Sequence, residues 1–254
     1  MAEQTCLRKI LLSFERTDRP FFLTESEKAF LLKDSPVDCL LSVPAAQMET
    51  LSPEDFIRGI LVEKLHACVV VAGECAPLRK ELLSLSRSGA FQVVSVPSVC
   101  SDGSPVSAAL LERYAENGPF RSLLDLLGHP FVMQGTVVHG KGLGRTRGMP
   151  TANLGLPANK ILPPFGVYAS VVHLEDGAVR TGLTNIGPRP SVDDIPVPTI
   201  ETYILDFDGD LYGQELTLEV REWIREIRKF TGGLEEVTEQ VGRDIESVRS
   251  VLAR

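Results

Sequence analysis

The sequence predicts two domains of different fold class, an α/β domain followed by an antiparallel sheet or barrel that ends in one helix. Helix signals alternate with short apolar strands up to about residue 128, which is typical of α/β layers. From Phe131 onward, β-rich segments are separated by turn residues, which favours an antiparallel architecture. The 254 residues accommodate one large domain or two of about 100–150 residues. We place the two domains at residues 1–129 and 130–254.

The first half contains two helices with clear start signals. Thr24 and Glu27 form a capping box, and Ser52 followed by Pro53 opens a second helix. Further strands are predicted over residues 67–72 and 91–96, and further helices over about 106–116 and 120–127. The first of these strands is a continuous apolar run, which suits a strand buried on both faces of a parallel sheet.

The second half is predicted to be mostly strand. Its β-rich segments span residues 132–138, 167–174, 178–184, 199–207 and 215–223. The turn sequences at 175–177 and 208–210 are hairpin candidates. From about Leu234 apolar residues recur at helical spacing. We expect this last helix to cover one opening or face of the sheet.

Composition excludes several classes of protein. With 26 basic and 34 acidic side chains, the net charge of −8 argues against broad binding to nucleic acid or anionic membranes. No apolar run approaches the ~18–20 residues of a membrane span, and the first residues lack the apolar core of a signal peptide. We therefore expect a cytoplasmic protein. Nothing in the sequence indicates its oligomeric state. The cysteines are interpreted as reduced thiols packed as small apolar residues: Cys6, Cys39, Cys68, Cys75 and Cys100.

A glycine-rich, basic segment between Gly135 and Gly148 is the strongest chemical signal. Glycines let backbone N–H groups approach phosphate oxygens, and Lys141 and Arg145 would offset phosphate charge. The segment fails as a P-loop because Gly142 replaces Ser or Thr, and as a dinucleotide fingerprint because Arg147 replaces the third glycine. The alternative is a flexible hairpin loop without a ligand.

Oxygen ligands follow this segment. Thr151 and Asn153 would share one face of an extended strand, and their oxygens suit a hard cation such as Mg²⁺. Ordinary turn polarity is the alternative. Glu201 lies in a predicted strand, where it is either a solvated side chain or a general base aimed into a cavity.

Two other polar groups are less specific. The aspartates at 206, 208 and 210 have the spacing of a calcium loop, but Leu211 replaces its glycine and Thr217 its final glutamate. A hairpin turn is therefore favoured there. A basic cluster with an aromatic residue, Arg225, Arg228 and Phe230, precedes the last helix. Without further evidence it is a solvated face.

Several motifs in the second half occur together and in order: GRTRGMPTAN, PPFGVYAS, TNIGPRPS, IETYILDFDGDLYGQEL and REIRKF. Over about residues 131–254 the chain resembles the riboflavin kinase family. The resemblance implies a small antiparallel β-barrel of riboflavin kinase type with a C-terminal helix. It also implies ATP- and Mg²⁺-dependent phosphorylation of riboflavin at its 5′-hydroxyl to give FMN.

The resemblance assigns roles residue by residue. Glu201 is expected to be the catalytic base, and Thr151 and Asn153 to bind Mg²⁺. The flavin is expected to contact Arg225, Arg228 and Phe230. The residues expected to contact ATP are Gly140, Gly142, Gly144, Arg145, Gly148, Thr151, Ile204, Asp206 and Tyr212.

The first half more distantly resembles the FMN adenylyltransferase half of the bacterial bifunctional enzyme that makes FMN and FAD. The related stretches are RPFFLTESEKAFLL, LSPEDFIRGILVEKLHACVVVAGE and VPSVCSDGSPVSAALLE. This implies an incomplete nucleotidyltransferase-like, Rossmann-type sheet.

Three departures from that family predict loss of adenylyl transfer. Its H-x-G-H loop is absent, and Met1 is expected to lie downstream of it. Gly73-Glu74 continues with Cys75-Ala76 instead of Asp-Phe, and Glu112 stands where the family has a phosphate-binding arginine. Two alternatives remain open: a bifunctional FMN/FAD-forming enzyme, and a flavin-binding regulatory protein without turnover.

Overall fold

The computed structural model describes residues 7–15, 18–48, 50–140, 149–189, 197–228, 230 and 233–253. Its contacts divide the chain into two compact units that are not collinear with the sequence. The α/β unit comprises residues 1–19 and 35–108, and the barrel unit comprises 20–34 and 109–254. The predicted division after residue 129 follows motifs instead of contacts, and it stays a prediction.

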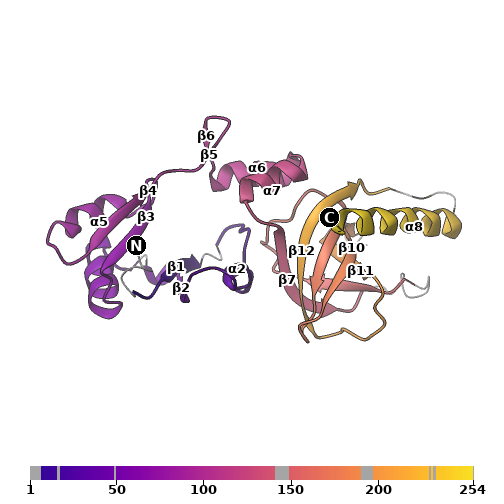
Figure 1. Cartoon of the computed structure of the whole chain (residues 1–254), viewed down its shortest axis with the longest axis horizontal. Helices are drawn as coiled ribbons and strands as arrows, with labels where there is room; N and C mark the ends of the chain where they lie inside the picture. The colour runs from indigo at the N-terminus through magenta and orange to yellow at the C-terminus, as the bar shows by residue number, and fades with distance from the viewer. Residues whose placement is uncertain are drawn as a thin grey trace. The chain divides into compact units, whose positions relative to one another are not determined.

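The α/β unit contains two pairs of parallel strands (Figure 1). Strands β1 (Ile10–Glu15) and β2 (Cys39–Pro44) pair with each other, as do β3 (Val69–Gly73) and β4 (Gln92–Val96). The parallel pairing of the two predicted strands is confirmed. Their burial on both faces is not, because Val71 in the middle of β3 is 65% exposed.

Short elements connect or follow these strands. They are α3 (Ala45–Met48), α4 (Pro53–Asp55), the π-helix η1 (Phe56–Lys64), α5 (Arg79–Ser86) and the small hairpin β5 (Cys100–Ser101) and β6 (Ser104–Pro105). The predicted start at Ser52 is confirmed, since its hydroxyl accepts a hydrogen bond from the Asp55 amide at 3.1 Å. Ile57 on η1 is fully buried and lies at the centre of this unit's core.

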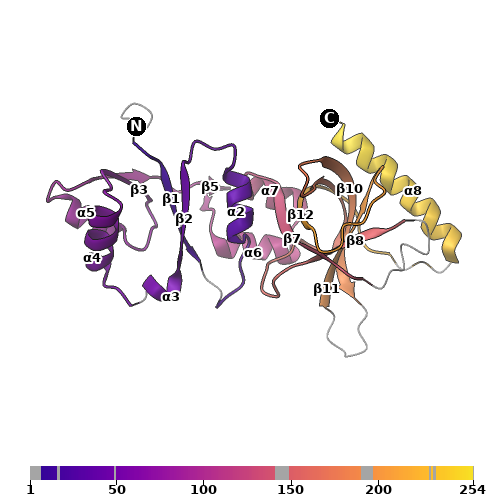
Figure 2. The same ribbon diagram turned by 90° about the horizontal axis from the view of Figure 1, so that it is seen from below.

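The barrel unit is a closed antiparallel barrel, as predicted (Figure 2). Its strands follow one another around the barrel in the order β10-β11-β8-β7-β12-β9. Their bounds are β7 Phe131–Val138, β8 Thr151–Gly155, β9 Gly166–His173, β10 Val179–Arg189, β11 Val197–Ile204 and β12 Glu215–Arg225.

One predicted hairpin is confirmed and the other is wrong. Strands β9 and β10 are joined by a tight turn in which Gly177 has φ +85°, a conformation that glycine adopts without strain. Residues 208–210 do not close a hairpin, because β11 pairs with β10 and β8 whereas β12 pairs with β7 and β9. The turn residues there serve a connection across the end of the barrel.

Side chains alternate between the barrel interior and its outer face. Tyr168, Ile186 and Ile200 are buried in the interior cluster. Val167 and Leu183 belong to an outer cluster that packs against α8 (Gly233–Leu252). The predicted last helix is therefore confirmed, and it covers one outer face of the barrel.

Three further helices belong wholly or mostly to the barrel unit: α2 (Glu25–Leu32), α6 (Ala108–Asn117) and α7 (Phe120–Leu127). The predicted capping box of α2 is confirmed. The Glu27 amide donates to the Thr24 hydroxyl at 3.2 Å, and the Thr24 amide donates to the Glu27 carboxylate at 2.7 Å. Phe120 of α7 enters the barrel core, with its ring 4.8 Å from that of Tyr168.

The interpretation of the cysteines as packed residues is wrong for the four that the structure describes. Cys39, Cys68, Cys75 and Cys100 are free thiols with exposed side chains, and Cys6 lies outside the described residues. The sulfurs lie in short, half-exposed segments of the α/β unit, where the core has little depth to bury them. None of the described helices is long and apolar enough to cross a membrane.

Candidate active site

A row of polar residues crosses three neighbouring strands of the barrel. Glu201 on β11 lies directly opposite Asn153 on β8 and, on its other side, opposite Asn185 on β10. Directly opposed residues of antiparallel strands project from the same face. The sheet register therefore brings a carboxylate and two carboxamides together, and two of the three are residues that the sequence predicted.

This row lies on the outer face of the barrel. The neighbouring residues Thr184 and Thr202 are buried, and their hydroxyl oxygens lie 3.0 Å apart. The Ser170 hydroxyl is 2.6 Å from that of Thr184. Because side chains alternate along a strand, Asn185 and Glu201 point outward above this buried hydroxyl chain. A layer of buried, hydrogen-bonded hydroxyl groups therefore lies beneath the site.

The predicted metal ligands share the outer face. Thr151 and Asn153 both lie in β8, two residues apart, so they project to the same side. The side-chain amide of Asn153 also donates a hydrogen bond to the backbone oxygen of Thr151, at 3.4 Å. A hydroxyl and a carboxamide oxygen are hard ligands that fit Mg²⁺ when phosphates and water complete its shell. Among the described residues there is no group of three or more His, Cys, Asp or Glu that could hold a metal by itself.

The start of the predicted ATP loop reaches this row. A Cβ atom added to Gly140 would lie 2.5 Å from the Asn153 side chain, so a larger residue at this position would displace that side chain. The other loop residues assigned to ATP, Gly142, Gly144, Arg145 and Gly148, lie outside the described residues.

The other residues assigned to the nucleotide have different surroundings. Ile204 is 5% exposed, so its side chain belongs to the interior core. Asp206 has φ +54° and pairs with Arg249 of α8 at 3.0 Å, with both side chains exposed. Tyr212 stacks on His139 with ring centroids 3.9 Å apart. Since His139 immediately precedes Gly140, the stack places Tyr212 beside the start of the ATP loop.

The predicted flavin contacts adjoin α8. The Nε–H of Arg225 is shared between the two Asp244 carboxylate oxygens, each at 3.0 Å, and Nη2 donates to one of them at 2.8 Å. The guanidinium lies 5.9 Å from the Phe230 ring. Asp244 is only 2% exposed. Arg225 therefore ties β12 to α8, and its contact with flavin stays a prediction. Arg228 is exposed.

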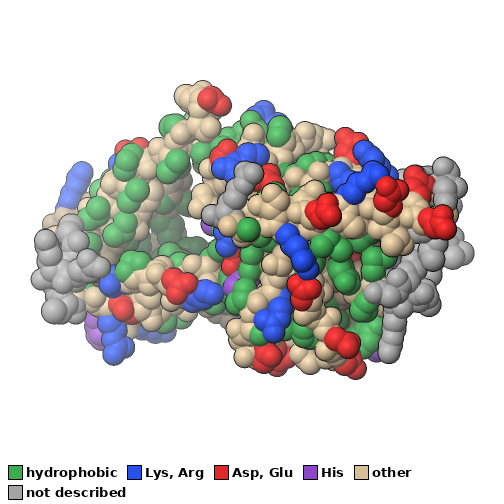
Figure 3. All heavy atoms as spheres, turned by 45° about the vertical axis from the view of Figure 1, so that its right-hand side comes forward, with side chains coloured by type: hydrophobic (Ala, Val, Ile, Leu, Met, Phe, Trp, Pro, Cys, Tyr) green, Lys and Arg blue, Asp and Glu red, His purple; other side chains and the backbone are tan. Residues whose placement is uncertain are grey.

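One face of the molecule carries charges of both signs. In the right-hand part of Figure 3, basic and acidic side chains are interspersed over the face turned toward the viewer.

Two residues near the row were missed by sequence reasoning. Asn185 lies in the quoted motif TNIGPRPS, and asparagine is depleted in strand interiors, which is a usable signal. His139 has no sequence pattern that marks it as part of a site. Its stacking partner, Tyr212, lies 73 positions further along the chain. Local sequence patterns do not reveal such a distant contact.

Comparisons with known proteins identify a family of similar chains. The riboflavin kinase family model, Flavokinase, matches residues 127–252. The bifunctional riboflavin kinase/FMN adenylyltransferase of Listeria monocytogenes is 31% identical over 252 residues, covering 96% of this chain and 79% of the relative. The protein of that name from Escherichia coli K12 is 33% identical over 226 residues, covering 86% and 71%.

A solved structure shows that the likeness extends over both units. It is named a macrolide-efflux protein from Streptococcus pneumoniae and is 25% identical to this chain. Its TM-score is 0.79, with 98% of this chain and 85% of that chain covered.

Proposed function

Because the chain belongs to the family of bifunctional riboflavin kinase/FMN adenylyltransferases, we propose that this riboflavin kinase uses ATP and Mg²⁺ to make FMN and has lost the transfer of adenylyl groups to FMN. The observation that carries the kinase chemistry is the register that places Glu201 opposite Asn153, beside Thr151 and the start of the glycine-rich loop.

Glu201 acts as the general base in this proposal. Its carboxylate accepts the proton of the riboflavin 5′-hydroxyl while that oxygen forms a bond to the γ-phosphorus of ATP and the bond to the leaving ADP breaks. Phosphoryl transfer depends mainly on positioning and on neutralising charge. A strand-borne carboxylate above a hydrogen-bonded layer suits this role, because its backbone is held in register on both sides.

Thr151 and Asn153 hold the metal in this proposal, through the hydroxyl and the carboxamide oxygen. Mg²⁺ bound there would neutralise charge on the phosphates. The loop from Gly140 to Gly148 would supply backbone N–H groups and Arg145 to the phosphates, and Asp206 and Tyr212 would contact the nucleoside. Arg225, Arg228 and Phe230 would border the flavin.

Two positions inside the chain support the loss of adenylyl transfer. Cys75 and Ala76 follow Gly73-Glu74, where the family has an aspartate and a phenylalanine, and the Cys75 thiol is exposed. Glu112 on α6 is an exposed carboxylate at the position of a phosphate-binding arginine. A carboxylate there repels a nucleotide instead of binding it. The relatives named above are bifunctional, so FAD formation is the competing outcome.

One assay tests the proposal. The purified protein is incubated with riboflavin, ATP and MgCl₂, and riboflavin, FMN and FAD are resolved by chromatography. We expect FMN alone, and none when EDTA removes the metal. Glu201→Gln, purified in parallel, controls for contaminating kinases and should lose most turnover, since an amide cannot accept the proton.

The outcomes separate the alternatives. FAD above the level of the control would show a bifunctional enzyme. Tight riboflavin binding without any product would show a binding protein. Turnover of Glu201→Gln near that of the unmodified protein would refute the assignment of the base.

A further inference from the structure

Asn185 lies beside the proposed base in the sheet register. It is the Cα partner of Glu201 across β10 and β11, and Asn153 is the partner of Glu201 on the opposite side. Cβ atoms of directly opposed residues are about 4.5–5.5 Å apart, which lets a carboxamide reach a neighbouring carboxylate. Asn185 and Glu201 are both half-buried. The carboxylate is therefore flanked by amide side chains on both neighbouring strands.

Buried neighbours fix the backbone at Asn185. Its neighbours Thr184 and Ile186 are both fully buried in the barrel. The Thr184 hydroxyl is 3.0 Å from that of Thr202, the residue next to Glu201. A one-residue slip of β10 against β11 would break this buried contact and expose apolar side chains. The opposition of Asn185 and Glu201 is thus maintained by the interior of the barrel.

Packing does not account for asparagine at this position. Its outward-facing neighbours, Val167 on β9 and Leu183 two residues away, are apolar and pack in the cluster with α8. Asparagine is disfavoured within strands, and a half-buried carboxamide needs hydrogen-bond partners. Of its two cross-strand partners, Val167 and Glu201, only Glu201 has a side chain that can accept a hydrogen bond.

From this arrangement we infer that Asn185 is a positioning residue for Glu201, which it orients through the amide N–H groups. A hydrogen bond from the side-chain amide restricts the rotation of the carboxylate, and a general base must lie within hydrogen-bond reach of the proton that it accepts. The inference deepens the proposed function and depends on Glu201 being the base. It assigns Asn185 no contact with the reacting atoms.

The test compares Asn185→Ala and Asn185→Asp with a control, Thr181→Ala. Thr181 lies on the same strand and face, but its partner is Val171. We expect both Asn185 variants to lose about tenfold or more in kcat, with the KM for ATP changed less than about twofold. Thr181→Ala should retain kcat. Unchanged thermal unfolding of the three variants confirms that the effect is not loss of fold.

The division of the effect between kcat and KM distinguishes positioning from a structural role. Asn185→Asp keeps the size of the side chain but removes its N–H donors, so it should lose kcat as Asn185→Ala does, while the KM for ATP stays nearly unchanged. An Asn185→Asp variant with the kcat of the unmodified protein, or an effect confined to KM, overturns the inference.

A double variant separates failure of this inference from failure of the proposed function. If Asn185 acts through Glu201, Asn185→Ala should cost little further turnover in the Glu201→Gln background. Activity of Glu201→Gln near that of the unmodified protein would overturn the base and this inference with it. Inactive Glu201→Gln combined with fully active Asn185 variants would overturn this inference alone.

Discussion

At the scale of single residues, Tyr168 shows how burial changes ionisation. Its side chain is fully buried in the barrel, and its hydroxyl donates a hydrogen bond to the backbone oxygen of Pro164. Burial raises the pKa of Tyr168 well above its ordinary value of 10.0. The folded protein therefore keeps this phenol neutral at a pH where the unfolded chain ionises it.

This shift predicts a loss of stability at high pH. Stability from a raised pKa is fully present below about pH 10 and is lost above it, because the unfolded tyrosine then releases its proton. Tyr168→Phe removes that linkage, and at pH 8 it should cost about 1–2 kcal/mol through the lost hydrogen bond. Urea unfolding should show that the two proteins differ less in unfolding free energy at about pH 10.5 than at pH 8. If that difference is the same at both pH values, the raised pKa of Tyr168 is contradicted.

The candidate site was only partly predictable from single residues. Thr151, Asn153 and Glu201 were found because their motifs occur in order along the chain. Asn185 was missed because its importance comes from register: it lies 16 positions from Glu201 but directly opposite it. Sheet register depends on which strands become neighbours, and local sequence does not specify that.

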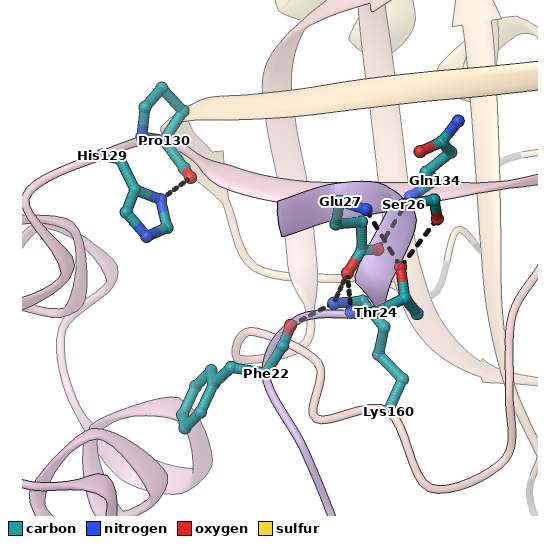
Figure 4. A network of polar contacts seen from close by, with 8 residues as sticks. All are labelled: Phe22, Thr24, Ser26, Glu27, His129, Pro130, Gln134 and Lys160. Atoms are coloured by element: carbon teal, nitrogen blue, oxygen red, sulfur yellow. Dashed lines mark hydrogen bonds and ion pairs between the residues drawn. The ribbon is translucent and has the colours of Figure 1, made fainter. Parts of the chain in front are cut away.

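At the scale of elements, helix α2 is joined to the barrel by a buried ion pair (Figure 4). The Glu27 carboxylate lies 2.9 Å from the Lys160 ammonium, and neither side chain is exposed. Glu27 also accepts a hydrogen bond from the Gln134 amide of β7 at 2.8 Å, and Lys160 donates to the Phe22 oxygen. Burial lowers the pKa of Lys160, and the nearby Glu27 opposes that change.

Breaking this pair should be costly. Lys160→Met leaves the Glu27 charge buried without its cation, which typically costs about 3–5 kcal/mol, whereas Glu27→Leu with Lys160→Met should cost less than the single change. The matched control is Arg243→Met, which breaks an exposed pair with Glu239 and should cost about 0–1 kcal/mol. Urea unfolding gives all three values. Equal losses in the two single variants would contradict the buried role.

Elements were predicted best where their signals are local. The capping box of α2 and the period of α8 needed only nearby residues. Strands β1 and β2 were missed because each is short and half-exposed, and their pairing joins segments 29 positions apart, such as Ile10 with Cys39. The turn at 208–210 was misread because a hairpin and a longer connection use the same turn residues.

At the scale of the whole molecule, the described site residues all fall within one of the two compact units. Thr151, Asn153, Asn185 and Glu201 all belong to the barrel unit, which also includes residues 20–34. The order of the motifs could not reveal that residues 20–34 belong to the barrel unit, because they lie far from the barrel strands in the sequence. The α/β unit, residues 1–19 and 35–108, has a separate core around Ile57.

This division predicts that kinase activity tolerates damage to the α/β unit. Ile57→Ala removes a fully buried side chain from that core, which costs about 2–5 kcal/mol. We expect faster proteolysis within residues 35–108 but kcat for FMN formation within about twofold of the unmodified protein. The matched change in the barrel core, Leu218→Ala, should reduce both stability and FMN formation. If Ile57→Ala instead abolishes turnover while the barrel unit stays resistant to protease, the α/β unit contributes directly to the kinase reaction.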